Sequence, residues 1–361
     1  METLLIIVLK ILLAFYILSI LYLLLMYYLK NTQATSLSPR EMNKPFREHH
    51  IALIFNGIIN EVDLLNQIQF LRQQNYQNFS AYFFTDSAII DANYIPNINI
   101  QIVSKKTYDP FEFVHLIGNN FYNKPEAVVV IRPNVILTDG ILNQLNLNLL
   151  HGKLVAQCKI EIIGDSTASY QALSKRFFNF IDREAMSANG LSAALWSHGF
   201  IIDYSIFKKL SFEEPNYSDK DLQAELISHS IHIHYLHQIT IKERSVQIQE
   251  LVINRSKWLA NYSFQAKIGF QLLIEAVKNP NLDKIVFGLN YLRSPLWIMF
   301  FASIGLLILD NWKMSALPFF NYIAFCGIVL SGIILFFNNL NPSKMNNSFT
   351  KSKDLIGIDP N

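Results

Sequence analysis

Residues 126–137 read EAVVVIRPNVIL, and this stretch decides the fold. Its apolar run, Ala127 to Ile131, has the length and the β-branched content of a strand that is buried on both faces. The run breaks at Arg132-Pro133-Asn134. Because α/β proteins usually place their chemistry at the carboxyl ends of strands, we expect this loop to lie at the functional edge of a sheet.

Strands and helices alternate on both sides of this stretch, which predicts an α/β fold with a doubly wound, mostly parallel sheet. The apolar runs indicate strands over residues 51–55, 80–85, 98–103, 127–131 and 153–158. The helix signals are an N-cap at Asn60 for a helix to about residue 74, Pro110 for a helix to about residue 122, and a helix start near Asp139. We therefore assign residues 51–245 to one domain.

Both ends of the chain are unusually apolar. Hydrophobic residues make up 51% and charged residues 16% of the 361 residues, which is an apolar excess for a soluble protein. Residues 1–30 contain a run longer than the roughly 20 residues that span a bilayer. Residues 291–337 contain two more runs, separated by the polar segment 310–313. The sequence thus predicts one N-terminal and two C-terminal transmembrane helices, the latter as a hairpin.

Basic residues predict the orientation of these helices. They follow the first and the last predicted span, as Lys30, Arg40, Lys44 and Arg47 and as Lys344, Lys351 and Lys353. By the positive-inside rule, the protein would be a multi-pass protein of the cytoplasmic (inner) membrane with its α/β domain in the cytoplasm. Residues 31–50 would be a linker and residues 338–361 a polar cytoplasmic tail.

Residues 246–290 mix large apolar side chains with lysines. This pattern predicts amphipathic helices that lie on the cytoplasmic face of the lipid bilayer. A soluble helix pair that closes the α/β domain is the alternative. The net charge of +2 gives no sign of nucleic acid as a partner.

Several segments of residues 51–261 follow one another in a familiar order. They read IALIFNGIINEVDLL, LRQQNYQNFSAYFFTDS, NGLSAALWSHGFIIDYSIF, YSDKDLQAEL and NRSKWLAN. Together they resemble the inverting family 2 glycosyltransferases of the membrane-bound polysaccharide-synthase type. The resemblance implies a GT-A-like fold of the nucleotide-diphospho-sugar transferase type. It also implies transfer of a sugar from a nucleotide sugar to a lipid-linked or polysaccharide acceptor.

The resemblance assigns roles to residues of this chain. Asn60, Glu61 and Asp86 would line the nucleotide pocket, and Arg255, Lys257 and Trp258 would border the diphosphate and the acceptor. Asp219 would be the base that takes the proton of the acceptor hydroxyl, and Asp221 would continue the acidic substrate-binding motif. The same residues also fit an ordinary helix start, with Ser218 or Asp219 as N-cap and Asp221 in the first turn. Both interpretations stay open.

The family's metal-binding Asp-x-Asp loop falls on Arg132-Pro133-Asn134, where both acids are missing. A divalent cation prefers anionic oxygen ligands, and Asn134 is a poor substitute, so this loop disfavours Mg²⁺ or Mn²⁺. The Gln-x-x-Arg-Trp motif is degenerate too, because Lys257 replaces its arginine.

Two explanations of the missing acids are open. Arg132 could replace the metal by pairing with the substrate diphosphate, and would then be catalytic beside Asp219. Alternatively, Arg132 neutralises Asp86 or Asp219 in a decayed site. The protein would then be an inactive membrane scaffold that partners a true synthase or other envelope-glycan enzymes.

Overall fold

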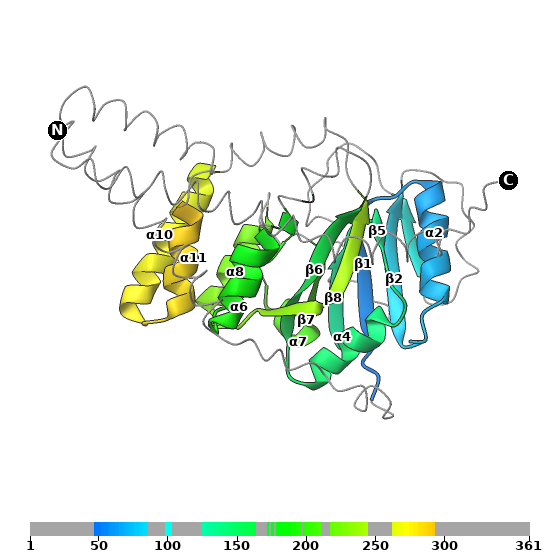
Figure 1. The fold of residues 1–361 in the computed structure, drawn as a ribbon, viewed down its shortest axis with the longest axis horizontal. Coiled ribbons are helices and arrows are strands. Elements are labelled where there is room, and N and C mark those ends of the chain that lie inside the picture. Colours follow the sequence, from blue (N-terminus) through cyan, green and yellow to red (C-terminus); the bar gives the residue numbers. More distant parts are fainter. Residues whose placement is uncertain are drawn as a thin grey trace, which may run out of the picture. The chain divides into compact units, whose positions relative to one another are not determined.

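The computed structural model describes residues 47–85, 98–102, 124–163, 172, 175–176, 178–196, 198–210, 217–244 and 262–292 (Figure 1). Within these residues, eight strands form one sheet with the order β3-β2-β1-β4-β7-β6-β8-β5. The position of the candidate site depends on how the two halves of this sheet meet at β4.

The first half of the sheet is parallel, as the sequence predicts. It contains β1 (Ile51–Ile58), β2 (Phe79–Thr85), β3 (Ile98–Ile102) and β4 (Ala127–Ile131). All five residues of β4 are buried, and β4 pairs with β1 in parallel register from Ile51 opposite Ala127 to Phe55 opposite Ile131. The carboxyl ends of β1 and β4 therefore lie at the same edge of the sheet, next to helix α2 (Glu61–Arg72).

The second half of the sheet is mixed. β7 (Phe200–Asp203) is antiparallel to both β4 and β6 (Val155–Ile163). β8 (His234–Arg244) is parallel to β6, and the short β5 (Val135–Ile136) is antiparallel to β8. The prediction of a mostly parallel sheet is therefore wrong for this half. The direction of a strand depends on the path of the chain that leads into it, which local periodicity does not report.

The remaining helices are α4 (Ile141–Leu150), a π-helical turn η2 (Phe180–Ala185), α6 (Met186–Ala188), α7 (Tyr204–Phe207), α8 (Asp219–Ser228), α10 (Tyr262–Lys278) and α11 (Leu282–Leu292). α10 and α11 pack closely where Gly269 meets Gly288. A Cβ on Gly269 would lie 2.7 Å from the carbonyl oxygen of Gly288, so this crossing requires glycine.

The predicted transmembrane helices are not part of the observed fold. In the ranges that the structure describes, no helix is both long enough and apolar enough to cross a membrane. The predicted spans fall almost entirely outside those ranges, as do most of the predicted linker and the whole predicted tail. An apolar run of suitable length is a property of composition and does not by itself establish a spanning helix. Within the described residues, the fold is an α/β fold with a mixed sheet.

Candidate active site

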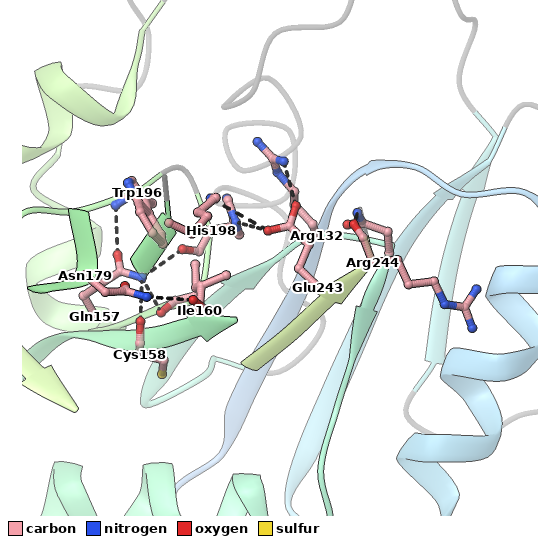
Figure 2. A network of polar contacts seen from close by, with 12 residues as sticks. Arg132, Gln157, Cys158, Ile160, Asn179, Trp196, His198, Glu243 and Arg244 are labelled. Carbon is pink, nitrogen blue, oxygen red and sulfur yellow. Dashed lines mark hydrogen bonds and ion pairs between the residues drawn. The ribbon is translucent and has the colours of Figure 1, made fainter. Parts of the chain in front are cut away.

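The loop that follows β4 meets the end of β8. Arg132 is the first residue after β4, and its Nη1 donates a hydrogen bond to Oε1 of Glu243 at 2.8 Å (Figure 2). The Glu243 side chain is 2% exposed and the Arg132 side chain 30%. The register of β5 and β8 places Val135 opposite Glu243, which explains how two residues far apart in sequence form an ion pair.

Two further groups lie at the second carboxylate oxygen of Glu243. Nε2 of His198 lies 3.0 Å from Oε2, and Nζ of Lys175 lies 3.8 Å from the same atom. Burial alone would raise the pKa of Glu243, but His198, Arg132 and Lys175 hold it well below its ordinary value. Burial, reinforced by the charge of Arg132, lowers the pKa of His198 to about 3. His198 is therefore neutral and donates through Nε2 to an ionised carboxylate, which can only accept.

Trp196 lies between two cations. Nζ of Lys175 is 3.7 Å from the centroid of the indole ring, and Cζ of Arg183 is 3.5 Å from it. Two cations at these distances from one face would overlap, so they occupy opposite faces in cation–π contacts. Burial lowers the pKa of Lys175 to about 7; Glu243 and Asp219 raise it, whereas Arg132 and Arg183 lower it.

The buried side chain of Gln157, on β6, holds Trp196 and His198 in place (Figure 2). Its Nε2 donates to the carbonyl oxygens of His198 at 3.1 Å and of Gly199 at 2.9 Å, and its Oε1 accepts from the backbone N–H of Trp196 at 2.9 Å. Gly199 has a φ of +71°, and a Cβ there would lie 3.0 Å from Ile160. Glycine is thus required for the turn that aims His198 at Glu243.

Asp219 is the first residue of α8. Ser218 is the N-cap, and its backbone N–H donates to Oδ2 of Asp221 at 2.9 Å, which completes a capping box. The predicted helix start is therefore confirmed. Burial raises the pKa of Asp219, while Lys220 and Arg183 oppose that rise. The charge of Asp219 in turn raises the pKa of Lys175 and of Arg183, so Asp219 belongs electrostatically to the cluster around Trp196.

Polar contacts also connect Asn60 and Asn134 at this edge. Asn60 caps α2 by accepting from the backbone N–H of Asp63 at 2.8 Å. Asp63 accepts from Arg244 at 3.0 Å, and the side-chain amide of Asn134 donates to the carbonyl oxygen of Arg244 at 3.0 Å. Glu61 is exposed in the first turn of α2. The structure thus gathers Asn60, Asn134 and Arg132 around the end of β8.

Four predicted site residues lie outside the described part of the chain, namely Asp86, Arg255, Lys257 and Trp258. The observed ion-pair partner of Arg132 is Glu243, which sequence reasoning missed, as it missed Lys175, Arg183 and His198. One signal could have identified Glu243. Along β8 the buried positions alternate as Ile239, Ile241 and Glu243, so a carboxylate continues a core-facing series at the end of a strand.

The described residues do not fit a divalent cation. No group of three or more His, Cys, Asp or Glu side chains among them could hold a metal ion. The best pair of donors, Glu243 and His198, bond to each other, and Arg132 and Lys175 face the same carboxylate. A metal would have to displace these contacts and would meet two cations.

No family model and no curated protein matches the sequence. Among solved structures, the chain is similar to the mannosyltransferase PcManGT from Pyrobaculum calidifontis in complex with GDP-Man and Mn²⁺, with a TM-score of 0.51 and 10% identity over 95% of each chain. The fold is GT-A-like. S. aureus TarS (residues 1–349) is a weaker match, with a TM-score of 0.42 and 11% identity over 78% of this chain and 88% of that one, and does not bear on this assignment.

Proposed function

We propose that the protein is a glycosyltransferase. It would transfer a sugar, with inversion, from a nucleotide sugar to a lipid-linked or polysaccharide acceptor. The observation that carries this proposal is the cluster of Arg132, Glu243 and Lys175 at the carboxyl edge of β4 in a GT-A-like fold. A partly exposed guanidinium at that edge suits an anionic diphosphate.

Arg132 is suited to receive the leaving group. Glu243 accepts a hydrogen bond from one terminal nitrogen of the Arg132 guanidinium. The guanidinium has further N–H donors in a fixed planar arrangement. These can pair with a diphosphate while Glu243 holds the side chain in place. Arg132 would thereby compensate the negative charge that grows as the bond between the anomeric carbon and the diphosphate oxygen breaks.

Asp219 is suited to act as the base. Its carboxylate would take the proton of the acceptor hydroxyl as that oxygen bonds to the anomeric carbon, and the nucleoside diphosphate would leave with the electron pair of the broken bond. A base is more effective when its pKa is shifted toward the working pH, and burial shifts the pKa of Asp219 in that direction.

We also propose that the protein works at the cytoplasmic face of the inner membrane. This is supported by large apolar side chains that α10 exposes at helical spacing, Phe264 (49% exposed), Phe270 (57%), Ile274 (57%) and Val277 (84%). Lys267 and Lys278 of the same helix are also exposed. Exposed apolar side chains with lysines beside them suit the surface of a bilayer with anionic lipids.

The alternative is an inactive scaffold, and one observation favours it. Arg132 already has an ion-pair partner inside the protein, Glu243, as expected of an arginine whose role is to neutralise a buried carboxylate. Mutation of the base distinguishes the two functions. Asp219→Asn would abolish glycan production in cells at unchanged protein level if the protein is an enzyme, whereas a scaffold would tolerate it.

The direct test is calorimetric titration and donor hydrolysis with UDP- and GDP-sugars, first with Mg²⁺ or Mn²⁺ and then with a chelator. We expect binding that survives the chelator and weakens by at least about tenfold, or about 1.4 kcal/mol, in Arg132→Ala. Wild-type protein that neither binds nor hydrolyses any nucleotide sugar under either condition would contradict the proposed function.

A further inference from the structure

More positive than negative charge gathers at the buried carboxylate of Glu243. Arg132 bonds to one oxygen at 2.8 Å, and Lys175 lies 3.8 Å from the other. The side chains of Glu243 and His198 are each 2% exposed, whereas those of Arg132 and Lys175 are 30% and 24% exposed. The two cations are thus the members of this cluster that reach toward solvent.

Lys175 is not needed to neutralise the carboxylate of Glu243. Their separation of 3.8 Å is longer than a hydrogen bond, and His198 already donates to the same oxygen at 3.0 Å. A lysine whose charge is well compensated keeps an ordinary or raised pKa. Burial is the main cause that lowers the pKa of Lys175 to about 7; Arg132 and Arg183 lower it further, whereas Glu243 and Asp219 raise it. Glu243 thus attracts the ammonium group without accepting a hydrogen bond from it, and an anionic ligand could accept that bond.

The position of Lys175 is nevertheless well defined. Its Nζ lies against one face of Trp196, while Arg183 lies against the other. Gln157 in turn holds the backbone of Trp196 to β6. A partly exposed cation that an aromatic ring fixes, beyond hydrogen-bond distance of its nearby carboxylate, is arranged for a ligand that brings an anion.

We propose that Lys175 and Arg132 together bind the diphosphate of the donor, as a two-cation clamp that replaces a divalent metal ion. The inference rests on the proposed function and adds a second cation to it. A nucleotide sugar carries one negative charge on each of its two phosphates. Arg132 offers a planar guanidinium group with several N–H donors, and Lys175 offers a compact ammonium charge. Both side chains lie beside the carboxylate of Glu243.

The test is titration of UDP-glucose, UDP-N-acetylglucosamine and GDP-mannose in a chelator at low salt. We expect Lys175→Met to weaken binding of the preferred probe by at least about tenfold. The matched control is Lys208→Met. Lys208 is an exposed lysine 5.7 Å from the ring of Tyr204. It follows β7 at the end where Asp203 pairs with Ala127, the opposite edge of the sheet from Arg132. This variant should bind within about twofold of wild type.

The pH profile provides a second readout. Lys175 is charged below pH 7 and loses its charge above it, so wild-type affinity should fall as the pH rises from about 6 to about 8. Glu243, Arg132, Arg183, Asp219 and His198 face it, and His198, with a pKa of about 3, stays neutral throughout. Lys175→Arg keeps a permanent charge and should bind with a flat profile.

Each outcome has a defined meaning. Wild-type binding that Lys175→Met leaves unchanged, that requires Mn²⁺, or whose pH slope persists in Lys175→Arg overturns the clamp and leaves the proposed function intact. If wild type binds no probe with or without metal, the proposed function fails and the clamp fails with it. Thermal unfolding of each variant verifies folding, and Lys175→Arg decides the matter if Lys175→Met does not fold.

Discussion

Glu243→Gln is the most informative single substitution, because it keeps the shape of the side chain and removes its charge. Loss of one partner from a fully buried ion pair costs about 3–5 kcal/mol. Arg132 is 30% exposed, so water recovers part of this loss, and the new amide can still accept a hydrogen bond. We therefore expect about 2 kcal/mol of destabilisation at pH 7, which corresponds to a fall in Tm of roughly 5 °C.

The effect of this substitution should depend on pH in one direction. The cluster holds the pKa of Glu243 well below its ordinary value, so the carboxylate contributes stability above the unfolded pKa of about 4.3. That contribution is lost as the pH falls through the lower pKa of the folded state. The difference between wild type and Glu243→Gln should therefore be full at pH 7 and should shrink below about pH 4.3.

Urea unfolding at several pH values measures this difference. Glu161→Gln is the matched control, because Glu161 pairs with Lys159 at 2.6 Å with both side chains more than one third exposed, and such pairs contribute about 0.5 kcal/mol or less. If Glu243→Gln is as stable as this control, or if its loss of stability persists undiminished in acid, the charge of Glu243 does not stabilise the fold.

Three further predictions concern other parts of the chain. Burial lowers the pKa of His198 to about 3, so the folded protein keeps this histidine neutral and becomes less stable as the pH falls below about 6.5. His198→Gln should reduce the pH dependence of the unfolding free energy between about pH 6.5 and about pH 3. An unchanged slope would contradict this. Asp283 of α11 accepts hydrogen bonds from the backbone N–H and the Oγ of Ser192 at 2.8 and 2.6 Å. Asp283→Ala should lower the free energy of unfolding in urea by about 1–3 kcal/mol. A decrease below about 0.5 kcal/mol would show that this contact does not hold α11. Replacing Phe264, Phe270 and Ile274 by serine should abolish co-flotation with vesicles that contain anionic lipids, whereas serines at the exposed Val62 and Leu65 should not; equal flotation of both variants would refute a lipid-binding face on α10.

Local sequence determined the elements whose causes are local. The run Ala127 to Ile131 forms β4 residue for residue, because five consecutive apolar, mostly β-branched side chains suit a strand buried on both faces. Asn60 and Ser218 cap α2 and α8 because their side chains reach backbone N–H groups three residues away. The position of Arg132 at the carboxyl edge of β4 follows from the same local pattern.

Tertiary structure alone decided what Arg132 meets there. Glu243 is 111 residues away in sequence, and the two sides of Trp196 are occupied by Lys175 and Arg183. The antiparallel direction of β7 and the pairing of β5 with β8 bring these groups together. Ion pairs and cation–π contacts act between side chains that are close in space, and no periodicity of the sequence encodes that proximity. The sequence by itself therefore determined the strand and the edge at which Arg132 lies, and the assembled sheet decided which charges gather at that edge.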